Sequence, residues 1–182
     1  MKRNTIRAIT ADRYNELIGE LGLNQAETAR FFQNTDNTIR HMERGKTLVD
    51  PRTAMLLEIM VAHDITPAQA VRSIRKAWSD PEKGARRFSR LIKRLGLSQR
   101  GAARFLGYNE RTTRYYTSGD TPVERRTIML LELMIKLEIT PDEALQLINI
   151  KPKVAAKATA AALGPEWAPR YYDKDIEAVR RD

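Results

Sequence analysis

The chain contains the same segment twice. Residues Leu17 to Ile74 align with residues Leu91 to Ile148 at a constant offset of 74 residues, without a gap. The shared strings include LGLNQAETARFF with LGLSQRGAARFL, and MLLEIMVAHDITPAQA with MLLELMIKLEITPDEA. Chance similarity does not keep its register over this length, so the sequence indicates a duplicated structural unit. A chain of 182 residues then divides more naturally into two small units than into one domain of ordinary size.

The apolar periodicity in each copy predicts helices. Apolar residues recur at steps of three and four from Tyr14 and from Phe88, as in an amphipathic first helix. Asn24 and Ser98 follow as N-caps of a second helix, and Glu27 completes a capping box in the first copy. Turn residues then open a third helix. We expect this helix to end at a glycine in the left-handed conformation, which is Gly45 in one copy and Gly119 in the other.

Two further helices complete each copy. The apolar stretches 54–61 and 128–137 predict a buried fourth helix. Thr66-Pro67 and Thr140-Pro141 each provide an N-cap threonine and a proline at the first helical position of a fifth. The sequence thus predicts an all-α protein made of two tandem five-helix domains. The expected divisions are residues 1–74 and 88–150 for the domains, a partly helical connector at 75–87, and a C-terminal tail at 151–182.

Composition limits the classes of function. The chain has no cysteine, which excludes disulfides, thiolate metal sites and cysteine nucleophiles. Its two histidines, His41 and His63, fall on different predicted helices without ligand partners, so we expect no enzyme, no cofactor and no metal site. No apolar run approaches the roughly 20 residues of a membrane span, and the N-terminus has no signal-peptide core. The expectation is a soluble cytoplasmic protein with no membrane partner.

The second helix, the turn and the third helix of each copy resemble the helix-turn-helix of the Cro and lambda-repressor type, known as the XRE family. The residues that carry this resemblance are a glutamine at the start of the second helix, a small residue at the helix crossing and the glycine that ends the third helix: Gln25 and Gln99, Ala29 and Ala103, Gly45 and Gly119. Gly107 occupies the usual turn glycine of the family. Gln33 stands at that place in the first copy, where it would have to adopt a less comfortable backbone conformation.

The resemblance implies binding to double-stranded DNA, with the start of the third helix in the major groove. The base-reading residues that it implies are Thr35, Asp36, Asn37, Arg40 and His41 in the first copy, and Asn109, Glu110, Arg111, Arg114 and Tyr115 in the second. The phosphate contacts that it implies are Gln25, Lys46, Arg52, Gln99, Arg100, Arg125 and Arg126. A hydrophobic seam beneath the motif is expected from Phe32 and Leu106, Ile39 and Thr113, and Met42 and Tyr116.

The net charge of +9 also points to a polyanionic partner, although the charge is unevenly distributed. Residues 14–74 contain eight acidic and six basic residues, whereas residues 88–148 contain seven acidic and ten basic ones. We therefore expect a transcriptional regulator in the bacterial or phage nucleoid that joins one strong DNA reader to a different, weaker one. A homodimer and a partner in the transcription machinery both fit this interpretation, as do a pseudo-twofold and a translational arrangement of the two heads.

A rival interpretation keeps the fold and changes the partner. The acidic first copy, together with Asp36 and Glu110 on the expected reading faces, favours a protein-interaction module such as an antiactivator, an antitoxin or an assembly factor. The basic second copy favours DNA.

Overall fold

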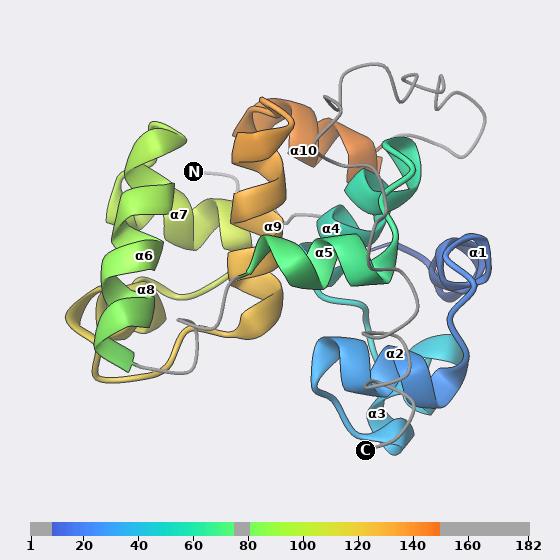
Figure 1. Ribbon diagram of the computed structural model, residues 1–182. Coiled ribbons are helices and arrows are strands. Elements are labelled where there is room, and N and C mark those ends of the chain that lie inside the picture. The colour runs from blue at the N-terminus through green and yellow to red at the C-terminus, as the bar shows by residue number, and fades with distance from the viewer. Residues whose placement is uncertain (1–8, 75–80, 150–182) are drawn as a thin grey trace.

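The computed structural model describes residues 9–74 and 81–149, and within these ranges the chain is all helical (Figure 1). The predicted tail at 151–182 and part of the connector lie outside the described residues. The helices are α1 Ala11–Glu20, α2 Gln25–Phe32, α3 Asp36–Glu43, α4 Pro51–Ala62, α5 Pro67–Ser73, α6 Pro81–Arg94, α7 Gln99–Leu106, α8 Glu110–Ser118, α9 Arg125–Lys136 and α10 Pro141–Asn149. The all-α class is thus confirmed, with α1–α5 falling in the first copy and α6–α10 in the second.

Capping residues define most of the helix ends at the expected positions. Asn24 and Glu27 form the reciprocal capping box of α2, and Thr66 and Gln69 form that of α5. Ser98 caps α7 through a hydrogen bond from the Gly101 backbone N–H. The α6 helix begins at Pro81, within the expected partly helical connector and seven residues before the expected start of the second domain.

The fourth helix of each copy begins three residues earlier than its apolar run predicts. Asp50 is the N-cap of α4, and Pro51 occupies the first helical position, where its missing N–H costs nothing. The α9 helix similarly begins at Arg125. The first turn of each helix is polar, so the apolar run does not predict it. These polar residues form a contact between the copies, which is described below.

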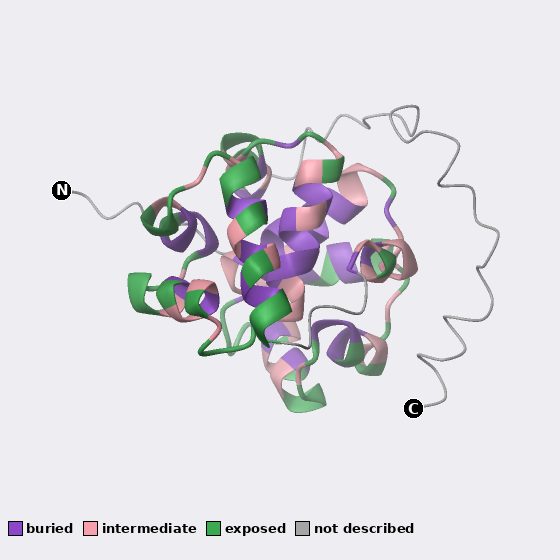
Figure 2. Ribbon diagram, turned by 60° about the vertical axis from the view of Figure 1, so that its left-hand side comes forward, coloured by how far each residue is buried: buried purple, intermediate pink, exposed green. Residues whose placement is uncertain are grey.

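Burial is most complete in α4. All nine residues from Arg52 to Met60 are buried, so no face of this stretch is left to solvent. Figure 2 shows that the buried residues gather in the central helices. A helix that is buried all round must have neighbours on every side. The first copy provides α1, whereas the second copy provides α9 and α10.

The contacts between the copies are reciprocal. The α4 helix packs against its own counterpart α9, α5 packs against α9, and α10 packs against α4. Each fifth helix therefore covers the fourth helix of the other copy, and buried residues of both copies belong to one hydrophobic cluster. Such a pattern, in which i contacts j and j contacts i, is that of an isologous interface with twofold symmetry. The division into domains at 1–74 and 88–150 stays a prediction.

Candidate nucleic-acid interface

The helix pairs α2–α3 and α7–α8, which correspond to the expected helix-turn-helix motifs, are built on the expected seam. Ala29 is 3% exposed and Ala103 is 1% exposed, which fits a small residue at the closest approach of two helices. The seam residues Phe32, Leu106, Ile39, Thr113, Met42 and Tyr116 are all buried. Thr113 differs from its counterpart Ile39 in one respect: its Oγ1 is buried without a hydrogen-bond partner among the described residues.

The turn before the third helix has the same backbone in both copies despite different residues. Gln33 has φ 55° and Gly107 has φ 69°, both in the left-handed region. The expectation of a less comfortable backbone at Gln33 is confirmed. Since Gln33 is exposed, nothing in the core compensates for that conformation.

The predicted base-reading residues lie on the outer face of α3 and α8 or at their N-termini. The exposed members are Thr35, Asp36, Asn37, Arg40, Asn109, Glu110, Arg111 and Arg114, whereas His41 and Tyr115 are half-buried. The structure thus brings each set together on one helix, with α3 and α8 on opposite sides of the central α4 and α9 (Figure 1). Their contact with bases stays a prediction.

Two of these residues also cap the helix that they begin. The Thr35 hydroxyl accepts a hydrogen bond from the Thr38 N–H at 3.2 Å, and the Asn109 side-chain oxygen accepts one from the Thr112 N–H at 2.7 Å. This capping occupies the oxygen atoms. Asn109 keeps its amide N–H₂ group for any contact with a base.

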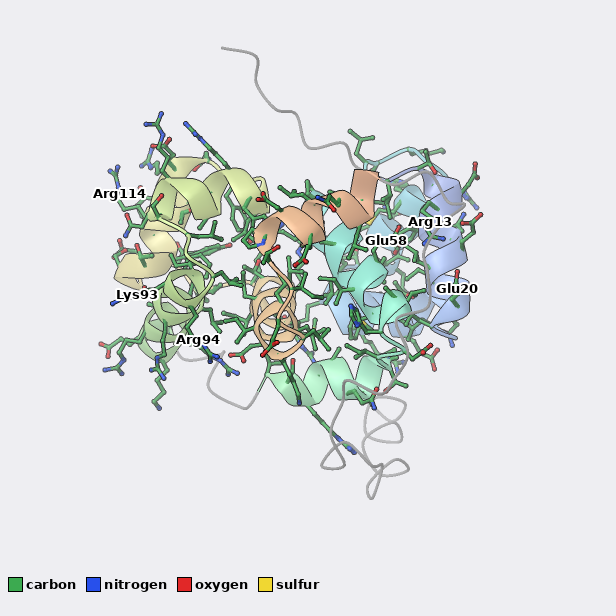
Figure 3. The ribbon with its side chains drawn as sticks, turned by 90° about the horizontal axis from the view of Figure 1, so that it is seen from above. Arg13, Glu20, Glu58, Lys93, Arg94 and Arg114 are labelled. Atoms are coloured by element: carbon green, nitrogen blue, oxygen red, sulfur yellow. The ribbon has the colours of Figure 1, made fainter. Side chains whose placement is uncertain are left out.

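The α8 surface has its own electrostatic arrangement. Arg100 on α7 forms an ion pair of 2.8 Å with Glu110, which compensates the carboxylate nearest the start of the helix. The Arg111 guanidinium lies 5.2 Å from the centroid of the Tyr115 ring, and its Nε donates to the tyrosine hydroxyl. Arg114 is exposed and projects away from the centre of the molecule (Figure 3). The outer face of α8 therefore presents positive charge with its one acidic residue paired.

The predicted phosphate contacts divide into two groups. Lys46, Gln99 and Arg100 are exposed, and Gln25 is half-buried. Gln25 and Gln99 tie the motif together, because the Gln25 amide donates to the Asp36 carbonyl at 2.9 Å and the Gln99 amide donates to the Thr117 hydroxyl at 3.0 Å. These four residues remain candidates for phosphate contact.

Arg52 and Arg126 are less suited to the predicted phosphate contact, because carboxylates of the protein already engage them. Arg52 is only 8% exposed, and its Nε pairs with Asp50 at 2.8 Å, while the Arg126 Nε pairs with Glu124 at 2.8 Å. The pairs also cross the interface, with Arg126 at 3.1 Å from Asp50 and Arg52 at 3.7 Å from Glu124. Two arginines and two carboxylates at equivalent positions thus form a closed charge network between the copies. A guanidinium held in this way already has its charge compensated by carboxylates.

Arg125 is also poorly suited to phosphate. Its side chain is half-buried, and burial lowers the pKa of its guanidinium. On the other side of the network, the Arg52 guanidinium stacks on the Tyr108 ring at 4.0 Å, and Tyr108 shares a hydrogen bond of 2.7 Å with Thr127. The polar first turns of α4 and α9 therefore belong to the joint between the copies.

The network also changes the acidity of Asp50. Burial alone would raise the pKa of this carboxyl, but the charges of Arg126 and Arg52 and the hydrogen bond from Thr53 outweigh it and hold the pKa below its ordinary value. Asp50 is therefore ionised wherever the protein is folded near neutral pH. The sequence contained one signal for this network, since Arg52 and Arg126 are identical, and Asp50 and Glu124 are both acidic, at the offset of 74.

No known protein family, curated protein or solved structure matches this chain. Within the described residues, no three acidic or histidine side chains are grouped so as to hold a metal ion. No helix of those residues has the length and apolar character needed to cross a membrane.

Proposed function

We propose that this protein binds double-stranded DNA sequence-specifically through α3 and α8 and acts as a transcriptional regulator. The observation that carries the proposal is the pair of equivalent helix-turn-helix segments, each with a polar, exposed outer face, held by one reciprocal interface. An α-helix fits the major groove, and arginine, asparagine and glutamine side chains on it read base edges. Arg111 and Arg114 are suited to guanine, and Asn37 and Asn109 to adenine.

The two heads act as a rigid pair in this proposal. The fifth helices cover the fourth helix of the opposite copy, and a charge network closes the joint, so separating the heads would expose the buried surface of α4 and break that network. A fixed pair avoids most of the entropy cost of joining two separate heads on DNA. The reciprocal contacts support a pseudo-twofold arrangement of the heads, and hence an operator with inverted half-sites.

The heads are expected to contribute unequally. The α8 surface has Arg111 and Arg114, and its acidic residue is paired with Arg100. The α3 surface presents Asp36 and a single exposed arginine, Arg40. A carboxylate facing the phosphate backbone is repelled, so the second copy supplies most of the affinity, and the first copy adds to it through its fixed position.

A salt titration of binding to a random duplex tests the proposal. Each phosphate contact contributes a slope of about −0.9 to log K against log salt, so four or five contacts imply a loss of about 10²- to 10³-fold between about 50 and 200 mM salt. Fluorescence anisotropy of a labelled duplex measures this slope. Absence of binding at the lowest salt would contradict the proposal and favour a protein partner for the same surfaces.

A further inference from the structure

The first helices of the two copies carry opposite charges on the same face. At the offset of 74 residues, the acidic positions of α1 correspond to arginines of α6: Asp12 to Arg86, Glu16 to Arg90 and Glu20 to Arg94. The apolar residues agree in type in the aligned segments ADRYNELIGE and ARRFSRLIKR, and Gly19 corresponds to a further basic residue, Lys93. Duplication has therefore kept the helix and reversed its charge. We call these two surfaces the acidic face and the basic face.

Both faces are built around an equivalent, partly buried ion pair. In the first copy, Arg13 on α1 pairs with Glu58 on α4 at 2.7 Å, and in the second copy Arg87 on α6 pairs with Glu132 on α9 at 2.7 Å. These pairs fix α1 and α6 to equivalent places in the fold. The reversed charges consequently occupy corresponding sites around a common anchor.

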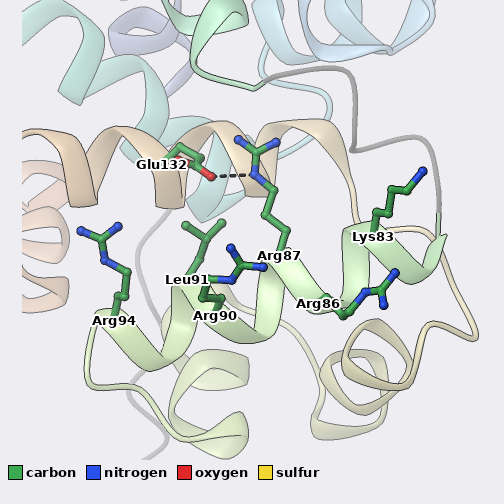
Figure 4. A pocket seen from close by; sticks show the side chains of 7 residues that line it. All are labelled: Lys83, Arg86, Arg87, Arg90, Leu91, Arg94 and Glu132. Carbon is green, nitrogen blue, oxygen red and sulfur yellow. Dashed lines mark hydrogen bonds and ion pairs between the residues drawn. The ribbon is translucent and has the colours of Figure 1, made fainter.

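The basic face lines a hollow. A space of about 440 Å³ lies between α6 and α9, bordered by five basic side chains together with Leu91 and Glu132 (Figure 4). Glu132 is paired with Arg87, and Arg86 reaches only the exposed Glu82 at 3.8 Å. Arg90 and Arg94 are exposed and have no ion-pair partner in residues 9–74 and 81–149. The hollow thus holds an excess of positive charge.

The acidic face is exposed as well. The side chains of Glu16 and Glu20 are 54% and 52% exposed, and Asp12 is also exposed. Arg13 lies near both glutamates, at 3.1 Å and 3.8 Å, but its strongest partner is Glu58. Two carboxylates therefore share one arginine that is already paired, and Asp12 adds a third carboxylate to the same helix, so the face keeps a net negative charge.

The two faces lie at opposite ends of the molecule. The α1 and α6 helices flank the central helices from opposite sides (Figure 1), and the labelled Arg13 and Glu20 lie far from Lys93 and Arg94 (Figure 3). One molecule is therefore unable to bring its own faces together. The charged residues of each face recur every four residues, which is about 6 Å along a helix. The charges of the acidic face therefore match the spacing of those on the basic face.

We propose that the acidic face of one molecule docks on the basic face of a second copy of this chain, so that the protein associates head to tail. An interface between two different surfaces of the same molecule is heterologous, and it leaves a free face at each end for the next copy. If the basic face bound DNA phosphate, the acidic face would have no role. Docking on a second copy of the chain uses both faces. The proposal does not rest on DNA binding.

Sedimentation of the DNA-free chain tests this proposal. At about 50 mM salt, the apparent mass should rise with concentration between about 10 μM and about 1 mM, because exposed charge pairs give weak contacts. At about 500 mM salt, the association should weaken by tenfold or more, because salt screens exposed charges. A monomer at every concentration in low salt would overturn the proposal, as would association that salt leaves unchanged.

Charge reversal identifies the surfaces. One variant combines Asp12→Lys, Glu16→Lys and Glu20→Lys, and the other combines Arg86→Glu, Arg90→Glu and Arg94→Glu. Each alone should associate at least tenfold more weakly than the unmodified chain, because like charges then face each other. An equimolar mixture of the two should associate again, since every acidic face then meets a basic one.

A matched control carries the same kinds of change elsewhere. Arg104→Glu with Glu138→Lys alters exposed charges outside both faces and should associate like the unmodified chain. Circular dichroism checks that each variant is folded, and a milder pair, Arg90→Gln with Arg94→Gln, replaces any reversal that unfolds. If the mixture of reversed variants stays monomeric while both are folded, the proposal is wrong. If the unmodified chain never associates and the α6 variants lose affinity for DNA, the basic face is instead a DNA-binding surface.

Discussion

The residue at the turn between the second and third helices differs between the copies, although the backbone does not. Gln33 and Gly107 both have positive φ, at 55° and 69°. A residue with a Cβ pays roughly 1–2 kcal/mol for the left-handed conformation, whereas glycine adopts it freely. The first copy therefore bears a local cost that the second avoids.

Replacing Gln33 by glycine should stabilise the protein. The strain relieved exceeds the extra backbone entropy that glycine brings to the unfolded chain, so we expect a gain of about 0.5–1 kcal/mol in the free energy of unfolding. The reverse control, Gly107→Ala, should lose about 1 kcal/mol, and its Cβ would lie 3.4 Å from the Pro51 side chain. Urea denaturation measures both. An unchanged or lowered stability for Gln33→Gly would show that the turn is not strained.

Some side chains were predictable from sequence because their role is local. The caps at Asn24, Ser98 and Thr66 depend on residues within one turn of the chain, and periodicity alone predicts the seam residues. Arg52 and Arg126 were not predictable in this way. Each has one partner two residues away and a second across the interface, 72 or 76 positions away. An arginine after the third helix has the same appearance in the sequence whether it meets phosphate or a carboxylate.

At the scale of elements, α4 and α9 determine how the molecule is held together. Their apolar runs predicted burial, but the complete burial of α4 requires α9 and α10 from the second copy, which no pattern within one repeat reveals. The charge network sits at the first turns of these two helices. Asp50 takes part in it and also caps α4 through the Thr53 N–H.

Removing the charge of Asp50 should weaken the contact between the copies. It should also make the stability of the protein depend less on pH in the acidic range. Asp50→Asn keeps a capping side chain but leaves Arg52 and Arg126 with less compensation, at a cost of about 2 kcal/mol near neutral pH. The pKa of Asp50 is lowered on folding, so its contribution is present above the ordinary value of 3.8 and is lost as pH falls through the lower, folded value. Thermal unfolding from neutral pH to about pH 3 tests this. An acid dependence equal to that of the unmodified chain would contradict the role of the network.

The α3 and α8 helices should differ in their contribution to the affinity for specific DNA. Arg111→Ala with Arg114→Ala removes two candidate guanine contacts, each worth about 1–3 kcal/mol, from the basic α8 surface. Asn37→Ala with Arg40→Ala removes the corresponding polar side chains from α3. Gel shifts should show the larger loss for the α8 variant. Equal losses would mean that the charge asymmetry of the copies does not determine affinity.

At the scale of the whole molecule, the duplication has produced one hydrophobic core with two outer heads. The sequence predicted the helices and the repeat, while the exchange of the fifth helices between copies came only from the structure. That exchange fixes the heads relative to each other. It also leaves α1 and α6 at the two ends, where their reversed charges are free to meet other molecules.

We propose that two heads related by a pseudo-twofold axis read DNA together. Selection of bound sequences from a random duplex library, with the full chain, tests it most directly. We expect two half-sites in inverted orientation, about 10 base pairs (roughly 34 Å) apart between centres, with the more strongly specified half-site belonging to α8. Half-sites enriched as a direct repeat, or no enrichment at low salt, would contradict the account.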